Sequence, residues 1–304
     1  MNRTTKPNYE FDQQFQSELV LDSQSILGEG PCWDPTENVL WWIDVRGQLV
    51  HRYSPATAEN ASYRVGQSVG CVVRRHKGGL MVAVENGFAS FDPASESCEI
   101  LADPEFDRPG NRFNDGKCDP SGRFWAGTMD DAEVDPRAGS LYCLDLDGQV
   151  HKRLEKIGVS NGIVWSADRQ TMYFIDSPTR RVDAFDYDDT SGEISQRRTV
   201  VEVPEGWGWP DGMAIDAQDR LWVALWAGWG VACFDPANGQ PIAFVDVPVA
   251  RSSACCFGGP ALDLLYITTA RDKMTADEPD QPLAGGLFYA DVGTRGTVFG
   301  SYLG

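Results

Sequence analysis

A six-bladed β-propeller, an all-β fold with four-stranded blades around a central channel, is the fold class that the sequence predicts. Three observations support this prediction. Six short aromatic or β-branched segments recur with a period of about 40 to 50 residues along the 304-residue chain. A second, alternating segment follows each of them and ends near Asp or Asp-Pro. The 31 glycines and 18 prolines are spread along the whole chain, as many tight turns between short strands require.

The first predicted strand of each unit lies where turn residues give way to an aromatic or β-branched run. Such runs favour strands because their side chains pack well on a pleated, half-buried surface. The six runs cover residues 38–44, 79–84, 122–127, 171–176, 220–224 and 263–268.

The second predicted strand of each unit ends in aspartate or proline, which supplies the turn that sends the chain back. These six segments cover residues 49–55, 87–93, 140–145, 181–186, 230–236 and 286–291. Intervening segments such as 242–247 provide further strands, so each unit has about four. A pair of β-sandwiches would not predict a unit period, and a β-helix would need shorter repeats.

The sequence contains no recognisable linker, so we expect one propeller domain over residues 1–304. Residues 15–21 precede the first full unit, and we expect them to complete the last blade and close the ring. Residues 1–14 are then expected to form a flexible N-terminal extension.

Composition excludes several classes of partner. The net charge of −19 would repel phosphate backbones and anionic lipid surfaces, which argues against nucleic-acid and membrane partners. The first twenty residues lack the apolar core of a secretory signal, and no run has the apolar length of a membrane helix. The eight cysteines include no Cys-x-x-Cys pair, so we expect free thiols in a cytoplasmic protein. Its assembly, as a monomer or a small homo-oligomer, stays open.

Four glycine-bearing segments carry an acidic or amide residue at a similar position before the aromatic run. They contain Glu29, Asn114, Asn161 and Asp211. Glu29, Asn161 and Asp211 precede their strand cores by ten to twelve positions, so we expect loops entering the innermost strands to bring them together at one mouth of the channel. Asn-Gly and Asp-Gly are also ordinary turn dipeptides, but a turn does not require a glutamate between glycines.

Two carboxylates and an amide carbonyl form an oxygen-only set that suits calcium, magnesium or manganese, and such an open site can also hold zinc. The three histidines, His51, His76 and His151, lie in different parts of their units, which argues against a histidine-ligated metal. At the equivalent position of the remaining two units stand Gly70 and the pair Cys255-Cys256. These residues would form pocket wall and leave one face of the ion open to a substrate.

Arg112 lies two residues before Asn114, so both side chains are expected on the same face of one strand. A guanidinium beside an amide is well shaped to hold the oxygens of a polar small molecule, although Arg112 could equally pair with a surface carboxylate. Asp115 is expected to point the other way and to cap the turn into Gly116. The tryptophans of segments 207–209 and 226–230 could stack on a sugar or pack between blades.

Taken in order, the motifs resemble the family of senescence marker protein, regucalcin and gluconolactonase, six-bladed propellers that hydrolyse sugar lactones. The resemblance covers nearly the whole chain after about the first twenty residues. It rests on Gly28-Glu29-Gly30-Pro31, Arg112-Phe113-Asn114-Asp115-Gly116-Lys117, Gly127-Thr128-Met129, Ser160-Asn161-Gly162, Val182-Asp183-Ala184-Phe185-Asp186-Tyr187, Pro210-Asp211-Gly212 and Cys256-Phe257-Gly258-Gly259.

The resemblance implies that Glu29, Asn161 and Asp211 bind one divalent cation, that Arg112 and Asn114 bind the substrate, and that Asp211 accepts a proton from water. Calcium is the first expectation for the ion, with zinc, manganese, magnesium and ferrous iron as alternatives. The implied substrate is an aldonolactone such as glucono-, galactono-, xylono- or arabinono-lactone, which is opened to its aldonic acid.

One position departs from the family pattern. Some members carry an acidic, sugar-contacting residue shortly after Gly-Thr-Met, where this chain has Ala132. The neighbouring carboxylates of Asp130, Asp131 and Glu133 are candidates to replace it.

Two other functions are compatible with the same residues. A polarising cation also serves the hydrolysis of aryl esters or organophosphates. Alternatively, the site is that of a calcium-binding regulatory propeller without a catalytic role.

Overall fold

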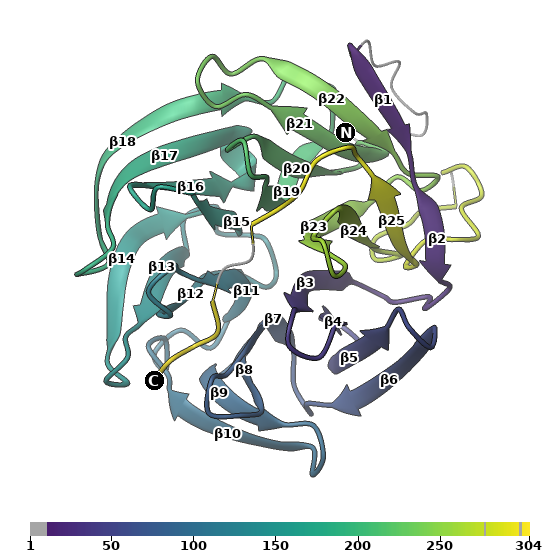
Figure 1. The fold of residues 1–304 in the computed structure, drawn as a ribbon. Coiled ribbons are helices and arrows are strands. Elements are labelled where there is room, and N and C mark those ends of the chain that lie inside the picture. The colour runs from purple at the N-terminus through teal and green to yellow at the C-terminus, as the bar shows by residue number, and fades with distance from the viewer. Residues whose placement is uncertain (1–10, 277, 298–299) are drawn as a thin grey trace.

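The computed structural model describes residues 11–276, 278–297 and 300–304. All regular elements of the described residues are strands apart from one short 3₁₀ helix, η1 (Ser177–Thr179). The strands form six sheets arranged as blades of a ring (Figure 1). The predicted six-bladed β-propeller is therefore confirmed.

Each blade contains four consecutive antiparallel strands or three strands completed by a fourth from elsewhere. From the channel outward, blade 1 contains β3 (Gly28–Asp34), β4 (Val39–Asp44), β5 (Leu49–Ser54) and β6 (Glu59–Arg64), and blade 2 contains β7 (Val69–Arg74), β8 (Leu80–Val84), β9 (Gly87–Asp92) and β10 (Ser97–Ala102). Blade 3 contains β11 (Asn111–Cys118), β12 (Phe124–Asp130), β13 (Gly139–Leu144) and β14 (Val150–Ile157), and blade 4 contains β15 (Ser160–Trp165), β16 (Thr171–Asp176), β17 (Arg181–Asp188) and β18 (Glu193–Glu202). Blade 5 contains β19 (Trp209–Ile215), β20 (Leu221–Trp226), β21 (Gly230–Phe234) and β22 (Pro241–Asp246), and blade 6 contains β23 (Ser252–Gly258), β24 (Leu264–Thr269) and β25 (Leu287–Asp291).

The N-terminal segment joins the last two blades (Figure 1). Strand β2 (Glu18–Leu21) pairs antiparallel with β25 and supplies the fourth strand of blade 6. Strand β1 (Gln13–Gln16) adds a fifth, parallel strand to blade 5 beside β22. Positions 13 and 14 thus lie in a strand and not in the expected flexible extension, because pairing with β22 satisfies their backbone groups while Phe15 packs against the core between blades 5 and 6. Residues 1–10 of that expected extension lie outside the described residues.

The glycine-bearing segments are themselves the innermost strands, and this corrects one expectation. We expected loops leading into the aromatic runs, but the aromatic runs are the second strands of their blades. The innermost strands escape recognition because they are buried on both faces and so lack the alternation of a half-buried strand.

Every innermost strand carries a β-bulge, seen as a register shift against its neighbour. Glycines at or beside the bulges allow the blades to approach closely. A Cβ at Gly70 would lie 2.5 Å from the carbonyl oxygen of Phe113 in blade 3, and one at Gly212 would lie 2.4 Å from the Cβ of Ala254 in blade 6. The glycines therefore serve blade packing near the axis rather than turns.

The hydrophobic cores lie between adjacent blades. Trp125 of blade 3 meets Trp165 of blade 4 edge to face, and Trp222 of blade 5 meets Phe257 of blade 6 in the same way. All eight cysteines are free thiols, and six of them are buried.

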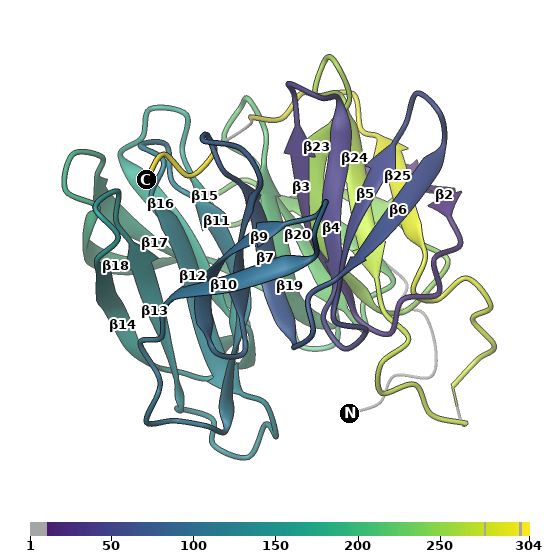
Figure 2. The same ribbon diagram turned by 90° about the horizontal axis from the view of Figure 1, so that it is seen from below.

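The C-terminal segment crosses the centre of the ring (Figure 1). Backbone hydrogen bonds run from Thr297 to Ile215 at the end of β19, from Tyr302 to Arg74 at the end of β7, and from Leu303 to Gly122. These partners mark the end of the channel where the innermost strands finish. In the view of Figure 2, strands such as β3, β4 and β24 run nearly upright between the two ends of the ring, whereas the outer strand β10 lies obliquely. Among the described residues no helix has the length and apolarity needed to cross a membrane.

Candidate functional site

A cavity of about 350 Å³ opens at the end of the channel where the innermost strands begin. All five predicted site residues line it. Glu29 comes from β3, Arg112 and Asn114 from β11, Asn161 from β15 and Asp211 from β19. The structure thus brings together residues from four blades that are up to 182 positions apart in the sequence (211 − 29).

The polar side chains of this cavity are deeply placed. Glu29, Arg112, Asn161 and Asp211 are all buried, and each lies at or beside the bulge of its strand. A bulge re-aims the side chains next to it, and here it turns polar groups toward the axis. Gly70 lies at the bulge of blade 2, and Ser253, rather than the expected Cys255-Cys256, lies at the bulge of blade 6. The residues that line the cavity include neither Gly70 nor the two cysteines, so the expected pocket wall from these residues is wrong.

Carboxylates at the ends of second strands hold the chain that leads into the innermost strands. Asp44, at the end of β4, accepts hydrogen bonds from the backbone N–H groups of Ile26 (2.9 Å) and Leu27 (3.0 Å), just before Glu29. In blade 4, Asp176 at the end of β16 accepts two backbone N–H bonds in the same way. The segments that present the site are therefore fixed by charge-assisted hydrogen bonds.

The carboxylates of the site repel one another in a buried environment. Burial raises the pKa of Glu29 above its ordinary value, and the charge of Asp115 adds to the increase. Burial also raises the pKa of Asp211, followed by the charges of Glu29 and Asp115. Arg112 lowers the pKa of both groups by a smaller effect. The protein side chains alone therefore leave negative charge at this point without full compensation.

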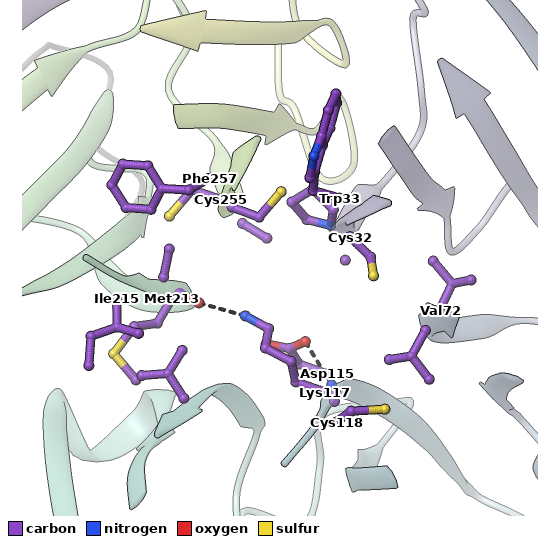
Figure 3. Close-up of a pocket in the computed structure, with 18 of the residues that line it drawn as sticks. Cys32, Trp33, Val72, Asp115, Lys117, Cys118, Met213, Ile215, Cys255 and Phe257 are labelled. Carbon is purple, nitrogen blue, oxygen red and sulfur yellow. Dashed lines mark hydrogen bonds between the residues drawn. The ribbon is translucent and has the colours of Figure 1, made fainter. Parts of the chain in front are cut away.

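Asp115 is the third carboxylate, and the predicted site did not include it. Its Oδ1 accepts the N–H of Gly116 at 2.7 Å, as expected, and its side chain lies in the narrow channel behind the cavity. That channel space, about 70 Å³, is lined by residues of all six innermost strands (Figure 3). Lys117 lies beside Asp115 there, and its Nζ donates to the backbone oxygen of Met213 at 2.9 Å. The pairing of an acid with a following glycine, as at Glu29 and Asp211, was the signal that could have identified Asp115.

Arg112 and Asn114 share one face of β11, and the two side chains contact each other. The Nη1 group of Arg112 donates to Oδ1 of Asn114 at 2.7 Å and to the backbone oxygen of Phe113 at 3.0 Å. Its Nε group donates to Oδ1 of Asp131 at 2.6 Å. Arg46, from the loop after β4, also binds Asp131. Arg112 is therefore both a cavity residue and the partner of a half-exposed carboxylate.

The three acidic residues after Met129 have separate places. Asp130 accepts backbone N–H bonds within its own loop and so shapes it. Asp131 holds the two arginines. Glu133 lines the cavity and forms an ion pair with Lys273, which belongs to the loop after β24. This ion pair joins blades 3 and 6 at the rim of the cavity.

The two asparagines are also connected. Nδ2 of Asn114 donates to the backbone oxygen of Ser160 at 2.8 Å and to Oδ1 of Asn161 at 3.1 Å. Nδ2 of Asn161 donates in turn to the hydroxyl of Ser177 at 2.8 Å. A continuous set of hydrogen bonds thus runs around the cavity through blades 3 and 4.

The donor set agrees with a hard divalent cation. Glu29 and Asp211 offer carboxylate oxygens and Asn161 an amide oxygen, which are ligands that calcium, magnesium and manganese accept. The described residues contain no group of three or more His, Cys, Asp and Glu side chains that could hold a metal ion. The proposed set has only two such residues, since its third member is an amide. The buried and incompletely compensated carboxylates fit an ion of charge +2.

Only two tryptophans of the segments 207–209 and 226–230 line the cavity. Trp209, which is 40% exposed, and Trp226 line it, whereas Trp207 packs against Phe11 and Phe234. Besides Asp115, the residues that the predicted site missed are Arg46, Ser177 and Lys273. Each lies in a loop or at a strand end outside the repeated motif, so the repeat gave no signal for it.

Comparison with known proteins identifies the family. The family model described as SMP-30/Gluconolactonase/LRE-like region matches residues 27–271. Regucalcin of Xenopus laevis is 40% identical over 293 residues, which cover 94% of this chain and 98% of that protein. A Bacillus subtilis protein named "Putative sugar lactone lactonase YvrE" is 38% identical over 279 residues, covering 91% of this chain and 95% of that protein.

Among solved structures, a regucalcin from Agrobacterium tumefaciens, described as a calcium-binding protein, superposes with a TM-score of 0.89. Its sequence is 27% identical, and the match covers 95% of this chain and 99% of that one. The family match includes all five predicted site residues. The chain therefore belongs to the SMP-30/gluconolactonase/LRE-like family.

Proposed function

We propose that the protein hydrolyses a sugar lactone to its aldonic acid with the help of one divalent cation. The observation that carries this proposal is the convergence of Glu29, Asn161 and Asp211 on an open cavity that also contains Arg112 and Asn114. The relative named as a sugar lactone lactonase supports the choice of substrate class. Glucono-, galactono-, xylono- and arabinono-lactone are the candidates.

Glu29, Asn161 and Asp211 would hold the cation through their side-chain oxygens, with calcium as the first expectation. When bound, such an ion polarises a carbonyl group and stabilises the negative charge that develops on its oxygen. Asp211 accepts a proton from the attacking water on a carboxylate oxygen, which is the general-base role that a buried carboxylate at the reacting centre can perform. No serine or cysteine nucleophile is needed.

Arg112 and Asn114 bind and orient the sugar. Nε and Nη1 of Arg112 are already engaged with Asp131, Asn114 and the backbone, and Nη2 donates to no residue that the structure describes. Nη2 is therefore the donor assigned to a substrate oxygen. Because the guanidinium is planar and held at two positions, the direction of that donor is fixed before the substrate binds.

The test is acid release from the four lactones, measured with and without a chelator. We expect turnover that the chelator abolishes and a divalent cation restores. Asp211→Ala should lower turnover by at least roughly a hundredfold. Asp235→Ala serves as the control, since Asp235 caps a remote surface turn and should not affect turnover. Turnover that survives chelation, or no turnover of any lactone, would contradict the proposal.

A calcium-binding role without catalysis is the second candidate, because a similar solved structure is described as a calcium-binding protein. The same experiment distinguishes the two. A regulatory site would bind calcium but show no hydrolysis of lactones, and Asp211→Ala would then change only binding.

Hydrolysis of aryl esters or organophosphates is a further possibility of the same site. The comparison of kcat/KM across lactones, aryl esters and organophosphates tests it. We expect the lactones to give the highest values.

A further inference from the structure

Ser177 lies outside the repeated motifs, yet it connects two strands of the proposed metal site. We propose that Ser177 is a positioning residue that fixes the side-chain amide of Asn161, so that the amide oxygen and not the nitrogen faces the cation. This inference rests on the proposed function, because it concerns the cation that the proposed function requires.

The contacts of Ser177 are short and buried. Ser177 is 8% exposed and begins helix η1, directly after β16 ends. Its Oγ lies 2.8 Å from Nδ2 of Asn161 and 2.6 Å from the backbone oxygen of Pro210. Ser177 therefore bridges the innermost strands of blades 4 and 5 at the edge of the cavity.

The number of protons fixes the direction of both hydrogen bonds. A serine hydroxyl has a single proton to donate, and the carbonyl of Pro210 can only accept. The hydroxyl must therefore donate to Pro210 and accept from Asn161. Only the NH₂ end of an amide can donate, so this end of Asn161 faces Ser177 and the oxygen end points away from it.

A second contact favours the same orientation. Nδ2 of Asn114 lies 3.1 Å from Oδ1 of Asn161, and Oδ1 of Asn114 accepts from Arg112. Arginine can only donate, so the orientation of Asn114 is also fixed. Ser177 and Asn114 therefore specify the same position for the amide oxygen of Asn161. This oxygen is the only one that the side chain can offer to a cation.

The bridge also connects two of the proposed ligands. Pro210 directly precedes Asp211, so the hydroxyl of Ser177 ties the backbone beside one ligand to the side chain of another. Outer partners of this kind determine the orientation of metal ligands and strongly affect metal affinity.

The hydroxyl of Ser177 is not needed to form the turn in which it lies. The backbone N–H of Ser177 donates to Val159 at 3.1 Å, and its carbonyl accepts from Arg180 at 3.0 Å. These bonds hold η1 independently of the side chain. Loss of the hydroxyl should therefore affect Asn161 more than the fold.

The experiment measures cation binding without turnover. Calcium chloride is titrated calorimetrically into metal-free full-length protein, and the melting temperature of the metal-free form is recorded separately. We expect Ser177→Ala to weaken calcium binding by roughly 10- to 100-fold. Its melting temperature without metal should match that of Ser166→Ala.

Ser166→Ala is the matched control. Ser166 is a buried serine of the same blade, and its hydroxyl contacts Asp168 and the backbone of Thr171. It directly follows the end of β15, whereas Asn161 lies near the start of that strand. Its replacement should leave calcium affinity unchanged. Ser177→Cys keeps the shape of the side chain but weakens both hydrogen bonds, so its affinity should lie between those of the wild type and Ser177→Ala.

The outcomes separate this inference from the proposed function. If wild-type protein binds calcium and opens lactones while Ser177→Ala and Ser177→Cys bind calcium equally well, the role of Ser177 is refuted and the proposed function stands. If the wild type binds no divalent cation, both are refuted. If Ser177→Ala does not fold, an unchanged affinity of Ser177→Cys still refutes the role.

Discussion

At the scale of single residues, Arg112 is held in place before a substrate arrives. Two of its nitrogen atoms are bound to a carboxylate, an amide and a backbone carbonyl, and burial tends to lower its pKa while Asp131 opposes that effect. Lysine is a single flexible point charge and cannot reproduce this fork.

We therefore expect Arg112→Lys to lower kcat/KM for the preferred lactone by about 10- to 100-fold, as the loss of a charged hydrogen bond predicts. The melting temperature should change little. Arg52→Lys is the control, since Arg52 forms an exposed ion pair with Glu37 away from the cavity. Unchanged kcat/KM in Arg112→Lys would remove Arg112 from substrate binding.

His51 shows how a titratable residue can be purely structural. Its ring stacks on Trp42 with the centroids 4.1 Å apart, and its Nδ1 is 2.8 Å from the hydroxyl of Ser62. Burial lowers the pKa of His51 to about 4. Between about pH 6.5 and pH 4 the unfolded chain, where the pKa is near its ordinary value, therefore binds a proton at this histidine that the folded protein does not bind.

The stability due to this histidine is present at neutral pH and is lost as the pH falls from about 6.5 toward 4. We expect the free energy of unfolding to fall by about 2 kcal/mol from this group between pH 7 and pH 5. Urea unfolding of the wild type and of His51→Gln at both pH values measures it. An equally steep loss in His51→Gln would show that another group is responsible.

At the scale of strands, sequence patterns predicted the outer parts of the blades better than the inner ones. The aromatic run predicted at 171–176 coincides with β16, and the run at 38–44 differs from β4 by one residue. The segments around Glu29, Asn161 and Asp211 resemble loops in the sequence because their glycines are typical turn signals, although these glycines serve close packing. The bulges that aim the site residues arise from pairing between strands, and no local pattern encodes them.

The glycine at position 212 tests this interpretation. In Gly212→Ala the new Cβ would lie 2.7 Å from the Cα of Ala254 and 3.0 Å from the backbone oxygen of Ser253, so blades 5 and 6 would have to separate. We expect the free energy of unfolding to fall by about 1–3 kcal/mol, as overpacking does.

Gly293→Ala is a useful comparison, because nothing lies within 4 Å of a Cβ at that position, although its φ of 68° adds backbone strain. Gly212→Ala should be the more destabilising of the two and should also weaken cation binding. If Gly212→Ala is as stable as the wild type, the close contact between the blades is not required.

At the scale of the whole molecule, the two chain ends hold the ring together at different places. Strand β2 completes blade 6, and the C-terminal segment connects blades 2, 3, 5 and 6 at the end of the channel away from the cavity. Tyr302 is the anchor of that segment. It is 3% exposed, packs in the core between blades 2 and 3, and donates its hydroxyl to the backbone oxygen of Asp145 at 2.8 Å.

We expect Tyr302→Ala to lower the melting temperature by roughly 5–10 °C, since the loss of a buried aromatic side chain costs about 3–5 kcal/mol. Leu303→Ala should have a much smaller effect, because Leu303 is 46% exposed. Thermal unfolding followed by circular dichroism measures both variants. Equal melting temperatures would mean that the C-terminal segment does not secure the ring.

The candidate site was predictable from sequence as far as the repeat reached. The similar spacing before the aromatic runs predicted Glu29, Asn161 and Asp211 as site residues. The alternation of side chains along a strand predicted that Arg112 and Asn114 lie on the same face. Arg46 and Lys273 were not predictable, because they reach the cavity from loops whose course depends on ring closure. The direction of the Asn161 amide also depends on Ser177 and Asn114, which lie outside its own strand, and sequence spacing does not reveal these contacts.

The central claim is that Glu29, Asn161 and Asp211 share one divalent cation. The most direct measurement is an anomalous difference map from crystals of the protein grown with manganese. We predict one strong peak within coordination distance of side-chain oxygens from all three residues. A map without a peak in this cavity, or with peaks only elsewhere on the protein, would contradict the claim.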